Sequence, residues 1–523
     1  MSRKLRPHLA ALAAACSVVL FTAACGASDP DDAAHASGEP VAGGTLEAIQ
    51  LTEPRSLDPA KLNNTWVHQS LVGNGLYGAL ITNDTETLET TFDLAADFST
   101  ADGGATFTLE LRPGLTFTDG TPLDAAAVKY NWDRLLDPAV GSEAIRQASQ
   151  IATSEVVGPT TLHVTMVAPN PHYPEAAMAS SMNWIASPTA LEKGQEAFDV
   201  NPVGAGPFTF SEWRRGDVIK LEKNPDYYDA PKPYLDAIEV RTVADVNQRA
   251  NTMLAGGADL SSETNRGNIL KANEAGLSTE IVSTGGGLFM GMNFRQAPFD
   301  DERARRAVAL AVDAEAVNNA VYKGEGLVPL TLFPEESPYY EDIPFPEPDP
   351  EAAQELFDEL ATEGKPVEFT ILAYSTVELK GVAEAIQAQL SAFDNVEVKV
   401  DALEFVQAAQ RVTTRDFGMA VTSAVAQDPD FALWTSFHSA SEVGNVAGVN
   451  DPELDAALDA GRIGTTLEDR KAAYATVQQR LLDLNPGIWY SRATPSLVWD
   501  EKVQGVDVYT LGSIMPEELW VTG

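Results

Sequence analysis

The sequence has very little cysteine. Among 523 residues the only two are Cys16 and Cys25, and both lie near the start of the chain. If a leading segment is cut away before Cys25, one thiol remains, so the mature chain cannot depend on disulfides or use a cysteine–histidine pair in catalysis. Histidine is also scarce, and the four histidines beyond residue 42 show no zinc-ligand spacing. We therefore predict no built-in metal.

Catalytic motifs are missing as well. The sequence has no G-x-S-x-G elbow, no GxGxxG and no P-loop. Gly285-Gly286-Gly287 is superficially similar to an oxyanion loop, but no nucleophile signature accompanies it, so a tight turn or hinge is the preferred interpretation. We predict that the chain is not an enzyme, with no catalytic residues and no cofactor.

Positive charge is in short supply. The chain has 35 Lys and Arg against 76 Asp and Glu, a formal net charge of -41. Such a surface repels nucleic-acid phosphates and anionic lipid headgroups, so these partners are not expected. The charge keeps a protein soluble and identifies no ligand.

Long apolar runs are absent too. The uncharged run 9–24 has 16 residues, fewer than the roughly 20 that span a bilayer as a helix. Basic residues precede it, and small residues lead to Cys25, which together indicate a secretory signal over 1–24. The end of this run resembles the bacterial lipobox, which implies an acylated Cys25 after cleavage; ordinary cleavage near Ala24 is the alternative. Residues 25–42 then form the lipidated cysteine and a polar, flexible tether.

From residue 43 onward the patterns are of mixed α and β type. Alternation predicts a strand over 105–111, and turns at Pro113-Gly114 and Asp119-Gly120 bracket a second one over 115–118. A helix follows over 125–136, with Asp124 as its N-cap.

The later chain predicts a βαβ unit. Strands over 367–373 and 396–400 flank a helix with an apolar face at Val382, Ile386 and Leu390, an arrangement typical of parallel pairing. Asp300 is expected to cap a helix that runs through Val308. Further helices are expected from Asp349-Pro350 and over 466–483, the second stopped by Asn485-Pro486-Gly487. The predicted architecture is α/β with more than one lobe.

Whole phrases of the sequence resemble the family 5 solute-binding proteins of ABC importers, the group of oligopeptide, dipeptide and nickel-chelate binders. The most specific phrase joins 94–97 (LAAD), 106–114 (TFTLELRPG), 117–122 (FTDGTP) and 127–130 (AVKY). The others are GGTL at 43–46 with PRSLDP at 54–59, PVGAGPF at 202–208 with KNPDYY at 223–228, MNF at 292–294 with PFDDER at 298–303, and DPD at 428–430 with FHS at 437–439 and NDPELD at 450–455.

The resemblance implies a periplasmic-binding-protein-like fold, a class II hinged trap of two lobes. Lobe I would comprise 43–285 and 486–523 with an extra subdomain inserted at 77–197, and lobe II would be 286–485. The chain would be a monomer that captures a peptide-like or other small organic solute. It would deliver the solute to an ABC permease with its ATPase, while the lipid on Cys25 holds it at the outer face of the cell membrane. A secreted hydrolase, or a lipoprotein chaperone or sensor on the same fold, is the alternative.

By position in the family's pattern, the residues expected to face the ligand are Asn64, Trp66, Trp184, Phe289, Asn293, Trp434 and Asn445. One departure concerns the ligand. The resemblance implies that peptide binders typically hold the free amine with an aspartate a few residues before the Asp-Pro or Glu-Pro of the last phrase, whereas here that stretch is Ser423-Ala-Val-Ala-Gln427. A buried ammonium without a carboxylate costs several kcal/mol, so we expect free-amine peptides to bind poorly. A shift of the alignment by four residues would bring Asp428 or Asp430 into the anchoring role.

Overall fold

The computed structural model describes residues 38–522. The predicted signal segment, Cys25 and most of the tether lie outside the described residues. Within them, two large sheets and one smaller sheet organise the chain. No helix among residues 38–522 has the length and apolarity needed to cross a membrane.

The first sheet has seven strands in the order β12-β18-β11-β1-β10-β9-β8. Strand β1 runs parallel to both β10 and β11, and β18 lies antiparallel to β11 and β12. Helices α7 (Val246–Leu254) and α8 (Arg266–Glu274) pack on β11. The strands are β1 Thr45–Gln50, β8 Phe208–Arg214, β9 Val218–Lys223, β10 Ala237–Thr242, β11 Leu260–Glu263, β12 Ser278–Ile281 and β18 Ser496–Trp499.

Between β1 and β8 the chain builds a four-stranded antiparallel sheet, β4-β5-β7-β6. As predicted, β5 covers Thr106–Leu111, and α2 (Ala125–Arg134) begins after Asp124, whose carboxylate accepts the Ala127 N–H at 2.9 Å. The elements of this segment are α1 Ser70–Tyr77, β2 Ile81–Asn83, β3 Thr90–Phe92, β4 Ala95–Ser99, α3 Ile145–Ala148, β6 Ile151–Val156, β7 Thr161–Met166, α4 Tyr173–Met178, α5 Pro188–Leu191 and α6 Gln195–Asp199.

The strand predicted over 115–118 is wrong. The structure has a single bridge there, between Thr116 and Pro122. Proline has no N–H to donate, and the turn at Asp119-Gly120 leaves only a few residues to pair, so the ladder does not extend.

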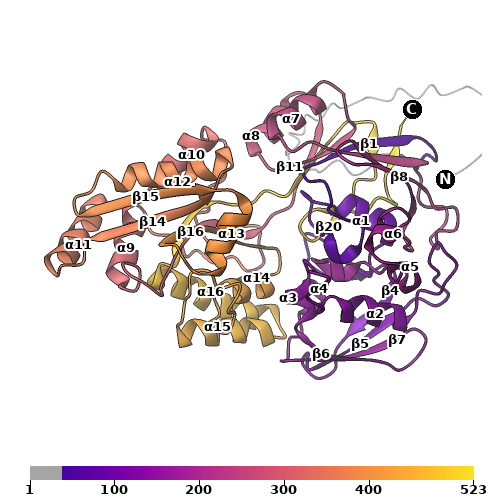
Figure 1. Cartoon of the computed structure of the whole chain (residues 1–523), viewed down its shortest axis with the longest axis horizontal. Helices are drawn as coiled ribbons and strands as arrows, with labels where there is room; N and C mark the ends of the chain where they lie inside the picture. The colour runs from indigo at the N-terminus through magenta and orange to yellow at the C-terminus, as the bar shows by residue number, and fades with distance from the viewer. Residues whose placement is uncertain (1–37, 523) are drawn as a thin grey trace, which may run out of the picture. The chain divides into compact units, whose positions relative to one another are not determined.

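The second large sheet has five strands in the order β15-β14-β16-β13-β17. Its βαβ unit agrees with the prediction: β14 pairs in parallel with β15 from Val367↔Val396 to Tyr374↔Leu403, and α12 packs on both strands. Figure 1 shows α12 and α10 along these strands. The strands are β13 Gly285–Met292, β14 Val367–Tyr374, β15 Val396–Leu403, β16 Met419–Ala426 and β17 Gly487–Ser491; the helices are α9 Glu302–Ala311, α10 Ala314–Tyr322, α11 Pro350–Thr362, α12 Val377–Leu390, α13 Phe405–Thr413, α14 Pro429–Phe437, α15 Pro452–Ile463 and α16 Leu467–Leu484.

Most predicted helix ends are found in place. Asp349 caps α11, Thr466 caps α16, and Asn485 ends α16 in the left-handed conformation. The predicted cap at Asp300 is one residue early, because Asp301 is the N-cap of α9. Asp301 accepts the Arg303 N–H at 3.1 Å and also binds the Arg303 guanidinium, which fixes the start of the helix there.

The boundary predicted at residue 486 is too early. Strand β17 still belongs to the five-stranded sheet, where it pairs antiparallel with β13. The chain rejoins the seven-stranded sheet only at β18, after which short two-stranded ribbons finish the chain: β19 Val503–Gln504 with β22 Trp520–Val521, and β20 Val508–Tyr509 with β21 Ser513–Ile514. Because this antiparallel pairing holds β17 beside β13, the chain returns to the seven-stranded sheet only after residue 491.

Candidate functional site

Two connections join the large sheets, and we call them the hinge: residues 282–284, before β13, and 492–495, after β17. They are visible as a pink and a yellow segment in Figure 1. The Val282 N–H donates to the Pro495 carbonyl at 2.8 Å, and the Thr284 hydroxyl donates to the Ala493 carbonyl at 2.9 Å. The two connections therefore run side by side and are bonded to each other.

Arg492 lies in the hinge and is buried. Its guanidinium donates to the backbone carbonyls of Thr284 at 3.0 Å and of Thr331 at 2.6 Å. Burial lowers the pKa of Arg492 to about 10, so it remains charged at neutral pH. The arginine ties the hinge to the loop before α11.

In the five-stranded sheet, the hinge leaves from the edge at which the parallel strands end. Strands β14, β15 and β16 run parallel and end at Tyr374, Leu403 and Ala426. Since β13 is antiparallel to β16, its first residue, Gly285, lies opposite Ala426. In open α/β sheets, ligands bind outside the carboxyl ends of the strands. This edge is therefore one half of the candidate site.

The seven-stranded sheet has the same relation to the hinge. Strands β1, β10 and β11 are parallel, and the last residue of β11, Glu263, pairs with Ser496, where the chain arrives from the hinge. Both sheets thus have their carboxyl edges on the hinge side. Residues from both carboxyl edges can therefore contribute to the candidate site.

Exposed apolar side chains gather at the carboxyl edge of the five-stranded sheet. The rings of Tyr374 and Phe405 stack with centroids 5.3 Å apart. Phe405 is 63% exposed, Val406 is 77% exposed and Val377, at the start of α12, is 93% exposed. We call these four residues the apolar edge group. Aromatic surfaces of this kind supply most of the contact area in small-molecule sites.

Sequence reasoning missed the apolar edge group. The signal was present, because Phe405 and Val406 stand directly after an alternating strand, at the start of a helix. On sequence alone an apolar pair at this place is indistinguishable from core.

The edge of the seven-stranded sheet contributes Trp66, which is partly buried. Its indole N–H donates to the Glu263 carbonyl at 3.0 Å. The Glu263 carboxylate is buried near Arg249, 3.7 Å away. Burial raises the pKa of Glu263, against the opposing effect of backbone N–H donors and Arg249. Trp66 is therefore fixed at its polar end while part of its ring remains accessible.

The two aspartates that follow β16 are both paired. Asp428 accepts from Arg470 at 2.6 and 2.9 Å, and Asp430 accepts from Arg462 at 2.8 Å. Burial would raise the pKa of Asp428, but the charge and hydrogen bonds of Arg470 outweigh it and lower that pKa. Neither carboxylate is free to anchor an ammonium. The preceding Gln427 donates from Nε2 to the Thr85 carbonyl at 3.2 Å, while its buried Oε1 accepts no hydrogen bond.

Comparison with known proteins decides the family. The family model described as "Bacterial extracellular solute-binding proteins, family 5 Middle" matches residues 89–443. This chain belongs to that family. The glutathione-binding protein GsiB of Escherichia coli (strain K12) is 30% identical over 369 residues, which are 68% of this chain and 69% of the relative.

Solved structures show the same fold. The ABC transporter-associated periplasmic binding protein DppA of Helicobacter pylori, in complex with the peptide STSA, superposes with a TM-score of 0.78 at 23% identity, covering 92% of this chain and 99% of that chain. The protein AgaA of A. tumefaciens R10, in complex with agropinic acid, gives a TM-score of 0.76 at 24% identity, covering 92% of this chain and 99% of that one. The predicted family and the two-lobed α/β fold are thereby confirmed.

In this family 5 protein, five of the predicted ligand-facing residues lie in the protein interior. Trp184 donates from Nε1 to Asn74 at 2.7 Å, and Phe289 packs on Trp489 with ring centroids 4.5 Å apart. Asn64, Asn293 and Asn445 are also buried, and each side chain donates to a backbone carbonyl: those of Met178, Phe417 and Val449 at 2.9, 3.1 and 2.7 Å. Contact between these side chains and a ligand stays a prediction.

The other two predicted residues, Trp66 and Trp434, are partly exposed. Trp434 stacks on His438 with ring centroids 4.4 Å apart, and the Arg462 guanidinium lies 4.2 Å from its ring centroid. Its indole N–H donates to Asp459 at 3.0 Å. These contacts fix the orientation of the ring, and its contact with a ligand stays a prediction.

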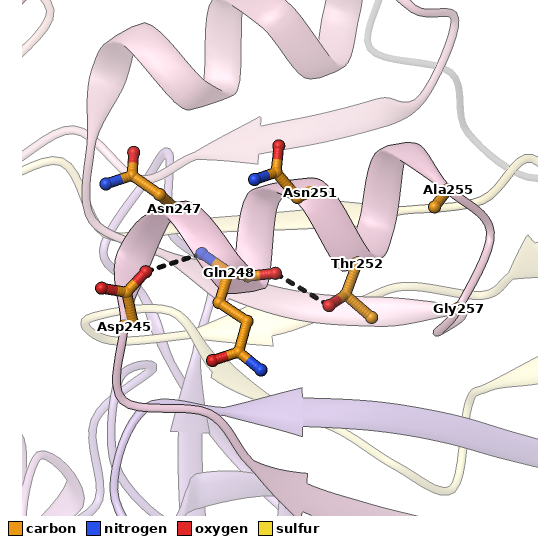
Figure 2. A pocket seen from close by; sticks show the side chains of 7 residues that line it. All are labelled: Asp245, Asn247, Gln248, Asn251, Thr252, Ala255 and Gly257. Atoms are coloured by element: carbon orange, nitrogen blue, oxygen red, sulfur yellow. Dashed lines mark hydrogen bonds between the residues drawn. The ribbon is translucent and has the colours of Figure 1, made fainter.

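A surface hollow of about 540 Å³ lies along α7. Figure 2 shows its lining on that helix, with Asp245 accepting the Gln248 N–H at 2.8 Å and Thr252 donating to the Gln248 carbonyl at 2.8 Å. No aromatic residue lines it. The lining residues are Asp245, Asn247, Gln248, Asn251, Thr252, Ala255 and Gly257. The hollow lacks the apolar walls of a ligand site, and we assign it no function.

Proposed function

We propose that this solute-binding protein captures a peptide-like or other small organic solute between the carboxyl edges of its two large sheets. The observation that carries the proposal is that both edges lie on the hinge side, and that one of them has an exposed apolar edge group. Closure about the hinge would bury this surface against Trp66 and the solute. Binding energy then shifts an open–closed equilibrium, and the closed form is the one that an ABC permease with its ATPase would read.

On this proposal, the end of the solute that lies near Gln427 carries no free ammonium. Three features support it: residues 423–427 have no acid, Asp428 is saturated by Arg470, and Asp430 is held by Arg462. The unpartnered Gln427 Oε1 could accept from a neutral N–H of the solute. A relative is named for glutathione, and neighbours were solved with the peptide STSA and with agropinic acid, which fits a peptide-like or other small organic solute.

Chemical recovery of the solute tests the proposal against a secreted hydrolase. The purified protein is incubated with N-acetylated peptides and with neutral glycosides, and the mixture is analysed by mass spectrometry. A binder returns every compound unchanged, and deletion of its gene abolishes uptake of the bound one. Turnover of a compound would favour a hydrolase, whereas binding without an uptake defect would favour a chaperone or sensor.

We also propose that the chain is anchored to the outer face of the cell membrane through lipid on Cys25 and acts as a monomer. Small residues precede this cysteine, and a polar tether follows it. Cys25→Ala should release the protein into the medium, measured by fractionation and immunoblot. Full retention in the membrane fraction would refute the anchor.

A further inference from the structure

A second set of contacts joins the two halves of the chain, away from the hinge. The segment before α4 contacts α14 and the end of α15, which lie in the chain between β16 and β17. Asn170 donates from Nδ2 to Asp430 at 2.9 Å, and both side chains are buried. The Nε2 atom of His172 lies 2.8 Å from the Gly464 carbonyl, after α15. A carbonyl only accepts, so Nε2 carries a proton and donates it.

The other ring nitrogen of His172 points to carboxylates. Nδ1 lies 3.7 Å from Glu175 Oε1, and Glu175 Oε2 is buried without a hydrogen-bond partner. One oxygen of Asp428 joins this group, so that potential ligand atoms from all three residues lie within 4.8 Å of one another. Two carboxylates from different halves of the chain therefore share one imidazole.

A metal ion does not fit this group. Asp428 Oδ1 accepts from Arg470 Nη2 and from the Asp430 N–H, both at 2.9 Å, and Oδ2 accepts from Arg470 Nη1 at 2.6 Å and from the Tyr339 hydroxyl at 3.2 Å. A carboxylate offers about four lone-pair sites, so none remains for a metal. A proton on His172 Nδ1 is the cation that the group can accept.

We propose that His172, Glu175 and Asp428 form a proton-dependent latch that holds the two halves together on the side of α4. This inference rests on the proposed function, because it assumes that the protein works by closing its lobes. The Nε2 N–H of His172 bonds Gly464, and a second proton, on Nδ1, adds a positive charge beside Glu175 and the Asp428–Arg470 ion pair. Loss of the Nδ1 proton leaves the Glu175 carboxylate without this counter-charge at the junction, which favours its opening.

The pKa shifts of His172 and Glu175 have the direction that the latch requires. Burial alone would lower the pKa of His172, but Glu175 and Asp428 raise it above its ordinary value despite the opposing charge of Arg470. Burial and the charge of Asp428 raise the pKa of Glu175. The latch is therefore strong at low pH and is lost as pH rises through the raised pKa of His172. The titratable and charged groups around it are Glu175 of α4, Asp428 and Asp430 at the start of α14, Arg462 of α15, Arg470 of α16, and Tyr339 before α11.

The test uses the solute-free protein between about pH 5 and 8, the range in which histidine titrates. Small-angle X-ray scattering measures the radius of gyration, and NMR of the histidine rings measures the pKa of His172. We expect the radius to grow as pH rises, with a midpoint above the ordinary histidine value of 6.5. His172→Gln retains a donor for Gly464 and should abolish the transition. Glu175→Gln should lower the pKa of His172.

His163→Gln is the matched control, since His163 is an exposed histidine of β7. It should leave the transition unchanged. A native radius that is constant with pH, or a His172→Gln profile equal to the native one, would overturn the latch. Solute binding measured on the same variants separates the two proposals. If solute binding is intact but the radius does not change with pH, the latch is refuted and the proposed function stands. If the radius changes with pH but no solute binds, the proposed function is refuted and the latch stands.

Discussion

Trp434 and Phe405 are the side chains whose removal should affect affinity most. Trp434 is held by His438 and Arg462, and Phe405 stacks on Tyr374 with most of its own surface exposed. Since Trp434 is partly exposed and Phe405 is exposed, we expect Trp434→Ala and Phe405→Ala each to weaken solute binding about tenfold, or about 1.4 kcal/mol. The melting temperature should change little.

Calorimetric titration with the bound solute measures this loss. Val167→Ala is the control, because Val167 is 68% exposed and lies in the four-stranded segment. Unchanged affinity together with a large loss of stability would place the rings in the core instead.

The buried carboxyl of Glu517 destabilises the folded protein when it is ionised, so its effect on stability depends on pH. Its carboxyl is buried, and burial followed by the charge of Asp93 raises its pKa well above the ordinary value of 4.5. A carboxyl with a raised folded pKa stabilises the fold at low pH, and this stability is lost as pH rises from the ordinary value through the raised one. We therefore expect Glu517→Gln to raise the melting temperature at neutral pH, with the gain disappearing on acidification.

Thermal scans across that range check the Glu517 prediction. The exposed Glu501, replaced by Gln, should show no such pH-dependent gain. A lower melting temperature of Glu517→Gln at neutral pH would contradict the destabilising effect assigned to ionised Glu517.

At the scale of elements, Gly286 shows what close packing at the start of β13 demands of the chain. Its φ is +69°, and a Cβ there would lie 1.7 Å from the Ala424 carbonyl oxygen. Gly114 has a similar φ of +81° but open space around it. We expect Gly286→Ala to destabilise the protein clearly more than Gly114→Ala, because only the first adds a backbone clash to the shared strain. Chemical denaturation of both variants measures the difference, and equal losses would contradict it.

Local signals predicted elements well because caps and alternation act over a few residues. Asp124, Asp349 and Thr466 cap the expected helices, and the βαβ unit pairs as its pattern indicates. The failures are also local in origin. Pro122 removes a donor that the strand over 115–118 would need, and Asp301 replaces Asp300 as a cap through its bonds to Arg303.

At the scale of the whole molecule, phrases of the sequence predicted the family and the two-lobed α/β fold, whereas long-range packing decides which of the candidate site residues are exposed. Trp184 and Phe289 match the aromatic chemistry of a site, yet long-range packing against Asn74 and Trp489 puts them inside. The pairing of Asp428 with Arg470, 42 positions later, likewise follows from how α14 and α16 meet. No local pattern could show that this aspartate is already neutralised.

The most direct test of the account is a calorimetric comparison of short peptides with their N-acetylated forms, alongside neutral solutes. With no acid in residues 423–427, and with Asp428 and Asp430 already held by arginines, this segment of the proposed site offers no free carboxylate for a free amine. We predict that an N-blocked or neutral solute binds and that unmodified dipeptides and tripeptides bind poorly. Submicromolar binding of unmodified peptides that acetylation abolishes would contradict it.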